Sequence, residues 1–406
     1  MKRPTILQIV PELDTGGAEL SAVEIGEAIV RASGRSLIAT EGGRLVGIAE
    51  SQGSEVLHFP AATKNPWRLA MNVRRLENIV RSENVDLIHG RSRAPAWSAL
   101  WAARRLNRPF VTTYHGAYSE RGALKRLYNS VMARGDRVIA NSHFTAQLIQ
   151  DRYQISQDRV RVIHRGVDRS FARGRVDAAR ITKLRQRWGI AENARIVLLA
   201  ARLTDWKGQQ VLISAATKLA QEQQLSDTVV VLAGDDQGRQ AYKAQLAGQI
   251  SAGNLNEHVR LVGHESDMAA AFAAAFVTVV ASTKPEAFGR SATEAQALGC
   301  PVIATRLGAP QETVLSPPAC SAEAMTGWLV APGNVEELAE RLKEALELTP
   351  EQRDAIGRRA AHHVHEGFSL EQMKFKTLCV YDELLGSDTA ARFSHTPAPV
   401  FFTGQA

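Results

Sequence analysis

The chain has 406 residues, of which 45% are hydrophobic and 22% are charged. A single core rarely grows beyond about 250–300 residues, so this length predicts two large domains. The ordinary composition excludes disordered, collagen-like and fibrous proteins.

The longest uncharged apolar run, residues 268–282, is shorter than the ~20 residues that a membrane helix needs. The basic start is not followed by a signal-peptide pattern, so we expect a cytoplasmic protein. The three cysteines contain no CxxC pair and predict neither a disulfide framework nor a thiolate metal site.

The formal net charge of +7 is unevenly distributed. Residues 1–190 contain 31 basic and 17 acidic side chains, a net charge of +14, whereas the remaining residues contain 18 and 25, a net charge of −7. A positive half is attracted to anionic surfaces such as phospholipid, lipopolysaccharide or nucleic acid. The alternative, that these arginines only solvate the surface, stays open on the sequence.

Apolar runs rich in β-branched residues alternate with helical patterns, which predicts parallel sheets with crossover helices. In the first half we expect strands at residues 6–10, 36–40, 55–59, 86–90, 110–115, 137–142 and 160–164. Helices are expected between most of them, for example at residues 18–31, 67–81 and 94–106. A second series of strands is expected at residues 196–202, 229–234, 259–264, 277–282 and 301–305. The predicted fold class is α/β, with two doubly wound, Rossmann-like domains in tandem.

The domain boundaries follow from where this alternation stops. We expect a first domain at 1–170, an Arg-rich linker at 171–190 without a sheet pattern, and a second domain at 191–366. A C-terminal helix is expected at 367–386. The tail at 387–406 mixes Ser, Thr, Pro and Gly and is expected to be poorly ordered.

The loops that follow the strands are the candidate sites, because ligands of parallel α/β sheets bind beyond the carboxyl ends of the strands. Gly16 and Gly17 follow the first strand and open a helix, where backbone N–H groups favour an anion. A plain glycine turn fits the same two residues. His115 ends a later strand beside Gly116, and either faces a ligand or has a structural role.

Two cations mark the first strand-to-helix junction of the second half. Arg202 and Lys207 are five residues apart, and Gly208 follows directly. A guanidinium and an ammonium beside a helix start suit a diphosphate, because charge-assisted hydrogen bonds neutralise its oxygens. An isolated pair of this kind is equally consistent with a solvated loop.

The segment Glu286-Ala-Phe-Gly-Arg-Ser-Ala-Thr-Glu294 is the more specific signal. Its two carboxylates are eight positions apart, one on a loop and one in the opening turns of a helix. Gly289 allows that helix to start tightly, so backbone N–H groups between Gly289 and Ser291 suit phosphate or sugar oxygens. The carboxylates suit the hydroxyl groups of a ligand.

Together these motifs resemble the glycosyltransferases of family 4, retaining enzymes of GT-B architecture that use nucleotide sugars. The resemblance covers nearly the whole chain, in the expected order. It is carried by Gly16-Gly17-Ala-Glu19, His115-Gly116, Asn141-Ser142, Arg165-Gly-Val-Asp168, Arg202-Leu, Lys207-Gly208, the Glu286 to Glu294 segment, Gly308-Ala-Pro-Gln-Glu312 and Gly327-Trp-Leu-Val-Ala-Pro-Gly333. It implies that the second domain binds the nucleotide sugar and the first the acceptor, across a cleft. It also implies that the C-terminal helix returns to the first domain.

The resemblance implies a role for each site residue. Arg202 and Lys207 would hold the diphosphate, Glu286 would orient the transferred sugar, and His115 would lie near the anomeric carbon; these four form the expected catalytic set. The expected donor-binding residues are Gly16, Gly17, Gly263, His264, Phe288, Gly289, Arg290, Ser291 and Glu294. Three positions depart from the family pattern, Ala201, Ala287 and Arg290, and they leave the identity of the donor sugar open.

Other classes are excluded by missing motifs. The absence of GxG argues against a dinucleotide oxidoreductase, and the absence of Gly-Lys argues against a P-loop NTPase. The absence of Gly-x-Ser-x-Gly argues against an α/β hydrolase. It has no Asp-x-Asp, so we expect no metal and no cofactor beyond the nucleotide-sugar co-substrate. Another GT-B activity, such as an epimerase or phosphorylase, stays open, as does a non-catalytic binder of anionic glycolipid.

The expected function is transfer of a hexose from a nucleotide diphosphate sugar to a lipopolysaccharide-core or lipid-linked glycan acceptor. The expected partners are the donor, an anionic glycolipid or glycan, and the anionic inner-membrane surface, which the protein contacts peripherally from the cytoplasm; no nucleic acid is expected. The expected membrane contacts are the basic and aromatic residues of 67–75, 91–93 and 118–126.

Overall fold

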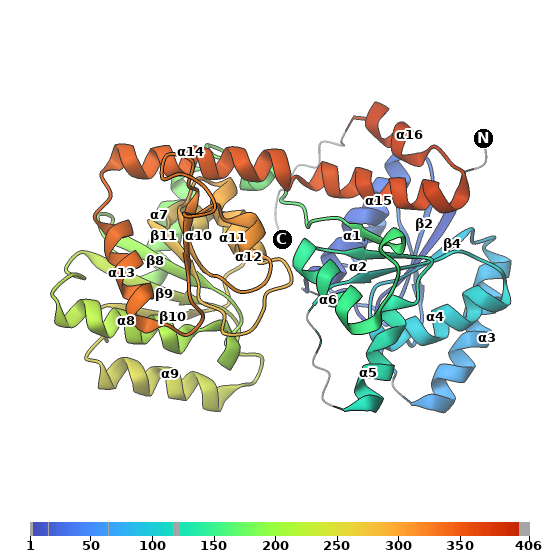
Figure 1. The fold of residues 1–406 in the computed structure, drawn as a ribbon, viewed down its shortest axis with the longest axis horizontal. Coiled ribbons are helices and arrows are strands. Elements are labelled where there is room, and N and C mark those ends of the chain that lie inside the picture. Colours follow the sequence, from blue (N-terminus) through green and yellow to red (C-terminus); the bar gives the residue numbers. More distant parts are fainter. Residues whose placement is uncertain (1–2, 15, 64, 117, 119–121, 398–406) are drawn as a thin grey trace. The chain divides into compact units, whose positions relative to one another are not determined.

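A computed structural model describes residues 3–14, 16–63, 65–116, 118 and 122–397 (Figure 1). The chain forms two compact units. The first contains residues Met1–His164 and Glu371–Ala406, and the second contains Arg165–Leu370. The second unit is thus continuous, whereas the first is assembled from both ends of the chain.

The first unit is built on a parallel sheet, with seven strands among the described residues in the order β3-β2-β1-β4-β5-β6-β7. The strands are β1 (Thr5–Ile9), β2 (Arg35–Thr40), β3 (Glu55–His58), β4 (Leu87–Gly90), β5 (Phe110–Tyr114), β6 (Arg137–Ala140) and β7 (Val160–Val162). The helices between them are α1 (Gly17–Arg31), α2 (Val46–Ser51), α3 (Pro66–Ser82), α4 (Arg93–Arg105), α5 (Ala123–Ser130) and α6 (His143–Tyr153). The central strands are buried on both faces, which explains their nearly continuous apolar sequence.

Helices cover both faces of this sheet. On one face, α3, α4 and α6 pack against the strands through residues such as Leu76, Ala99 and Ile149. On the other face, α1 and α2 close a smaller cluster through Val23 and Ala49. The strand order reverses between β1 and β4, and this is where a doubly wound sheet offers a ligand site.

The second unit repeats the plan with a six-stranded parallel sheet in the order β10-β9-β8-β11-β12-β13. Its strands are β8 (Arg195–Ala200), β9 (Thr228–Ala233), β10 (Val259–Gly263), β11 (Val277–Val280), β12 (Val302–Thr305) and β13 (Gly327–Val330). Its helices are α7 (Ala178–Trp188), α8 (Gln209–Gln221), α9 (Gln240–Ala252), α10 (Met268–Ala274), α11 (Arg290–Ala297), α12 (Pro310–Thr313), α13 (Val335–Leu346) and α14 (Pro350–Gly367). The α8, α9 and α13 layer covers one face, and α7, α10 and α11 cover the other. The prediction of two doubly wound domains is confirmed.

The segment expected as a linker has a different structure. Within residues 171–190 lies α7, and its Leu184 and Trp188 are buried in the core of the second unit. The change of unit falls instead at Arg165. The Arg-rich sequence gives a weak signal for this helix, because most of the helix surface is polar and the apolar side chains that anchor it are few.

The C-terminal tail also differs from expectation. Residues Thr389–His395 form α16, whose Phe393 is buried, so this part of the tail is not poorly ordered; residues 398–406 lie outside the described residues. Strand β13 was not expected either, because four residues beginning with glycine give a weak strand signal.

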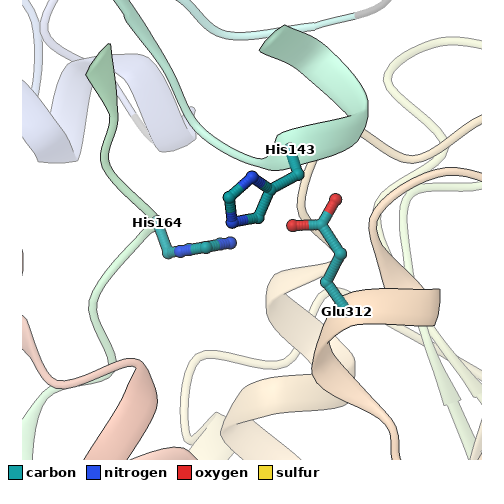
Figure 2. A group of neighbouring side chains, drawn as sticks. All are labelled: His143, His164 and Glu312. Atoms are coloured by element: carbon teal, nitrogen blue, oxygen red, sulfur yellow. The ribbon is translucent and has the colours of Figure 1, made fainter. Parts of the chain in front are cut away.

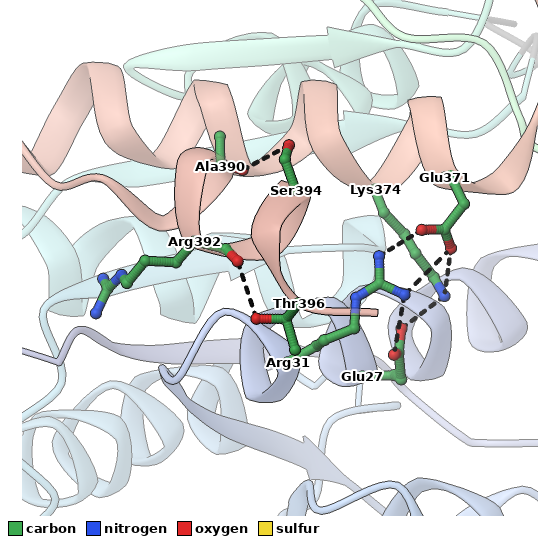
Figure 3. A network of polar contacts seen from close by, with 8 residues as sticks. All are labelled: Glu27, Arg31, Glu371, Lys374, Ala390, Arg392, Ser394 and Thr396. Carbon is green, nitrogen blue, oxygen red and sulfur yellow. Dashed lines mark hydrogen bonds and ion pairs between the residues drawn. The ribbon is translucent and has the colours of Figure 1, made fainter. Parts of the chain in front are cut away.

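The C-terminal segment is attached to the first unit by a buried ion cluster (Figure 3). Glu27 of α1 lies 2.6 Å from the Nζ of Lys374 on α15 (Leu370–Leu385), and Arg31 is paired with Glu371. The Arg31 guanidinium also lies 3.6 Å from the ring centroid of Phe393 on α16. Two cations and two carboxylates therefore connect the first helix to the last two.

Nowhere in the described ranges is a helix both long and apolar enough to span a bilayer.

One of the expected membrane contacts, Arg91, is wrong because its side chain is buried. Arg91 is only 2% exposed, and its Nε donates to Gln8 Oε1 at 2.7 Å, so it serves the interior of the first unit. Its neighbour Arg93 donates to Asn129 and covers the ring of Tyr118.

Candidate functional site

The strongest concentration of predicted site residues lies in the second unit, where the strand order reverses between β8 and β11. Crossovers leave these neighbouring strands toward opposite faces, so their carboxyl ends leave room for a ligand. Arg202 and Lys207 follow β8, and Glu286 follows β11. The fold thus brings together residues that are 79 positions apart in the sequence.

Lys207 is positioned by a short turn that only glycine permits. It ends the 3₁₀ turn η4 (Asp205–Lys207), and Gly208 then adopts φ +77° before α8 begins. A Cβ at Gly208 would lie 1.9 Å from the carbonyl oxygen of Ala281, so no side chain fits. The chain after β8 is thereby held against the end of β11, with the Lys207 side chain mostly covered.

Glu286 is the centre of the polar cluster. It is 8% exposed, and its Oε1 accepts from Lys207 Nζ at 2.5 Å and from Ser282 Oγ at 2.6 Å. Its backbone is fixed as well, because the Ala309 N–H donates to the Glu286 carbonyl at 3.0 Å. A carboxylate held on both sides keeps one orientation, and the adjacent ammonium compensates its charge.

The start of α11 adjoins this cluster. Gly289 adopts φ +84° as the N-cap residue, and the cap has no side-chain hydrogen bond. The Ser291 hydroxyl donates to the Ala200 carbonyl at 2.8 Å, which fixes the helix start against the end of β8. Arg290 pairs with Glu294 one turn later, with its NH2 at 2.8 Å from the carboxylate. The sequence predicted these residues as a group, and they do share this edge of the sheet.

Four predicted residues have other surroundings. Arg202 is exposed, and its guanidinium lies 3.5 Å from the side-chain oxygen of Gln237, so it adds an accessible cation at this edge of the sheet. Gly263 is the last residue of the edge strand β10, and His264, which follows it, is exposed. Phe288 is 3% exposed and packs its ring against Phe368, 5.9 Å between centroids. The Phe288 ring is thus used in packing within the second unit, and its role in donor binding stays a prediction.

The first unit contributes Gly16, Gly17 and His115 at the carboxyl edge of its own sheet. Gly16 caps α1, and a Cβ there would lie 1.9 Å from the Glu19 carboxylate, so this carboxylate lies over the helix start. His115 directly follows β5 and is half-buried. An acid at the start of α1 occupies the position that an anionic ligand would take.

Two further histidines share that edge and were not predicted. His143 opens α6 after β6, and His164 follows β7, with 5.4 Å between their ring centroids (Figure 2). Each lies at the end of a strand, the same signal that singled out His115. Ser282 was also missed, although it lies two residues after the end of β11 and four residues before Glu286.

In chemical terms, the edge of the second sheet offers a cation next to a fixed carboxylate, a second accessible cation, and a glycine-capped helix start. Cations of this kind stabilise negative charge that develops on a phosphate leaving group, and a fixed carboxylate orients hydroxyl groups. The arrangement suits a ligand that has both a phosphate and a hydroxyl-rich part.

Comparison with known proteins supports this interpretation. Residues 15–171 match the family described as Glycosyltransferase Family 4, and residues 180–363 match Glycosyl transferases group 1. A D-inositol 3-phosphate glycosyltransferase of Kribbella flavida is 28% identical over 77% of this chain and 74% of that protein. That of Streptomyces coelicolor is 30% identical over 69% of this chain and 66% of that protein. With that of Salinispora tropica the match spans only 53% of the relative's length.

Solved structures agree. A glycosyltransferase from Rickettsia africae is 32% identical, with a TM-score of 0.86 over 96% of this chain and 100% of that one. Anabaena HepE in complex with UDP-glucose is 26% identical, with a TM-score of 0.79 over 94% of this chain and 100% of that one. WaaG, a glycosyltransferase involved in lipopolysaccharide biosynthesis, is 18% identical with a TM-score of 0.72 and shows the shared fold only.

Proposed function

Since this chain belongs to the group 1 glycosyltransferases of GT-B fold, with a family 4 segment in its first half, we propose that it transfers a hexose from a nucleotide diphosphate sugar to an anionic glycan acceptor. The observation that carries the proposal is the cluster of Lys207, Glu286 and Ser282 where the second sheet reverses its strand order. The relative HepE, crystallised with UDP-glucose, is consistent with a nucleotide-sugar donor.

The proposed mechanism starts from the Lys207 to Glu286 ion pair. A diphosphate brings more negative charge than one carboxylate, so donor binding draws Lys207 toward the phosphates and frees a Glu286 oxygen for the sugar hydroxyls. Arg202 adds the second cation, and together the two stabilise the charge that grows on the diphosphate as the glycosidic bond breaks. Glu294 takes the ribose hydroxyls, and His115 of the first unit contacts the transferred sugar. We propose retention of the anomeric configuration and no requirement for a metal.

The acceptor is proposed from charge. The first 190 residues have a net charge of +14, which favours a phosphorylated acceptor such as a lipopolysaccharide core or a lipid-linked glycan, reached by peripheral contact with the anionic face of the inner membrane. The names of the relatives favour a second candidate, a phosphorylated polyol such as D-inositol 3-phosphate. Both candidates are anions.

The test is a panel of nucleotide sugars assayed for nucleotide release, first with a membrane glycolipid extract and then with D-inositol 3-phosphate. Release that depends on one acceptor identifies it, and the NMR coupling of the new anomeric proton gives the stereochemistry. Nucleotide-sugar epimerisation without an acceptor, or binding of glycolipid without turnover of any donor, would replace the proposal by one of its rivals.

A further inference from the structure

Large apolar side chains that are exposed gather on two helices of the first unit. Among the described residues the four most exposed are Leu124 at 84%, Trp67 at 81%, Leu127 at 53% and Met71 at 50%. Trp67 and Met71 lie one turn apart at the start of α3, and Leu124 and Leu127 lie three residues apart on α5. Residues at these spacings share one helix face, so each helix presents an apolar face to solvent.

The fold holds both helices firmly in place, so this exposure is not the result of fraying. Asn65 caps α3 by accepting from the N–H groups of Trp67 and Arg68, at 3.0 and 3.3 Å. Neighbouring residues of α4 connect to both helices, since Ser98 donates to the Leu69 carbonyl and Trp97 to the Tyr128 carbonyl. Helices α3 and α5 are therefore both attached to the same turn of α4, and Figure 1 shows α3, α4 and α5 in the lower part of this unit.

The same two helices also contain an excess of cations. Helix α3 contains four arginines and one glutamate, and α5 contains Lys125 and Arg126 with no acid, which gives the two helices a net charge of +5. Arg68, Arg74 and Lys125 are exposed. Long basic side chains around a Trp and aliphatic residues are the pattern of a surface that lies in a membrane interface, where the apolar groups enter the acyl boundary and the cations meet lipid phosphates.

The position of this surface suits the proposed acceptor. Helix α5 begins eight residues after His115, and α3 begins eight residues after the end of β3, so both helices start from loops at the carboxyl edge of the sheet. A bilayer bound there would lie close to the edge where His115 is found. An acceptor anchored in that bilayer would reach the edge without leaving the membrane.

We propose that this α3–α5 surface, defined by Trp67, Met71, Leu124 and Leu127 with the cations Arg68, Arg74 and Lys125, docks the first unit onto an anionic phospholipid bilayer. The inference rests on the proposed glycolipid acceptor and names the surface that reaches it. Single apolar side chains ringed by cations complement a lipid headgroup layer, whereas a protein partner would require a broader contiguous apolar patch.

The test uses the full-length protein and sedimentation with vesicles of phosphatidylcholine alone or mixed with phosphatidylglycerol. One variant combines Arg68→Glu, Arg74→Glu and Lys125→Glu, and a second combines Trp67→Ser, Leu124→Ser and Leu127→Ser. The charge variant is expected to lose at least about a hundredfold in affinity for the anionic vesicles, because each basic residue contributes about a factor of five. The apolar variant is expected to retain salt-sensitive binding at reduced affinity. In the wild type, vesicles containing brominated lipid should quench the fluorescence of Trp67.

Two matched controls share the helix or the unit but lie outside the surface. Arg81→Glu removes a cation from the far end of α3, and Ile48→Ser removes an apolar residue that is 43% exposed on α2. Both controls should bind as the wild type does. Equal binding of the wild type to neutral and anionic vesicles, or unchanged binding of the charge variant, would overturn the proposal. Self-association in the absence of vesicles that the apolar variant abolishes would overturn it in favour of a second copy.

Transfer to a detergent-dispersed acceptor keeps this result separate from the proposed function. Both surface variants should turn over that acceptor at the wild-type rate, because none of the substituted residues belongs to the Lys207 and Glu286 cluster. If the wild type transfers to no acceptor, the proposed function fails while the vesicle result still decides the docking surface.

Discussion

At the scale of single residues, the cluster of Lys207, Glu286 and Ser282 is the proposed centre of the chemistry, and its cation offers the most direct test. Lys207→Ala or Arg202→Ala is expected to lower kcat by about 10²- to 10³-fold, because each substitution removes charge stabilisation from the leaving diphosphate. Initial rates of nucleotide release measure this effect. Lys284→Ala is the control, because its side chain is 64% exposed and its nearest acid, Asp205, is 3.8 Å away. Near-normal turnover of both site variants would contradict the diphosphate assignment.

Ser282 provides a finer test at the same scale. Its hydroxyl donates to Glu286 at 2.6 Å, and it is 1% exposed. Ser282→Ala should raise KM for the donor by roughly tenfold while the protein stays folded, because the loss of one charge-assisted hydrogen bond costs about 1.5–3 kcal/mol at most. Ser282→Thr retains the hydroxyl and should recover much of the affinity. If KM is unchanged in the alanine variant, Ser282 does not position Glu286 for the sugar.

His89 is expected to make the stability of the first unit depend on pH. Its ring lies between Tyr381 and Thr113, each 2.7 Å from a ring nitrogen, and burial lowers its pKa well below the ordinary 6.5. The unfolded chain therefore binds a proton in a range where the folded imidazole stays neutral. The contribution of neutral His89 to the free energy of unfolding is fully present above pH 6.5. It falls as the pH decreases below this value, by up to about 1.4 kcal/mol per pH unit.

Urea denaturation between pH 7.5 and pH 5, roughly the range in which histidine titrates, measures this slope. His89→Gln should be less stable at neutral pH and show a flatter decline, since its side chain does not titrate. His58→Gln, at an exposed position on β3, should decline as the wild type does. An identical slope in the His89 variant would show that other groups cause the acid sensitivity.

At the scale of elements, the ion cluster decides whether the C-terminal helices stay on the first unit. Glu27→Gln leaves Lys374 and Arg31 buried with only the half-buried Glu371 to compensate them. We expect a loss of about 3 kcal/mol in the free energy of unfolding, because an uncompensated buried charge is costly. Glu55→Gln is the control: it breaks an exposed pair with Arg35 and should cost about 0–1 kcal/mol.

Hydrogen exchange locates this effect. Amide protons of α15 and α16 should exchange faster in Glu27→Gln, while those of α8 and α9 in the second unit should be unchanged. If the whole chain is destabilised uniformly, or if neither variant changes the unfolding free energy, the cluster does not act as the attachment of the C-terminal segment.

At the scale of the whole molecule, the cations at the edge of the second sheet predict that activity requires no metal. Arg202 and Lys207 supply two positive charges beside the proposed diphosphate site, comparable to the charge of one divalent cation. Nucleotide release should therefore be unchanged in excess EDTA. Activity that is lost in EDTA and restored by magnesium or manganese would contradict metal independence, and the family assignment would remain unaffected.

The sequence determined the parts of this protein that depend on local pattern. Buried parallel strands are continuous apolar runs, and loops at their ends hold glycines and charges, so both doubly wound sheets and the residues of 286–294 were identified from sequence alone. Most strand ends were placed one or two residues too late, because the polar residues beyond a strand continue its pattern, whereas those of β2, β4 and β12 were predicted correctly.

Only the tertiary structure decided which side chains meet and which are exposed. The contact of Lys207 with Glu286, the burial of Arg91 and the packing of Phe288 all depend on partners from distant parts of the chain. The same holds for the exposure of Trp67, since an apolar residue at a helix start is buried or exposed according to its neighbours. The burial of a side chain and its contacts depend on residues from all parts of the fold, so a local sequence pattern does not determine them.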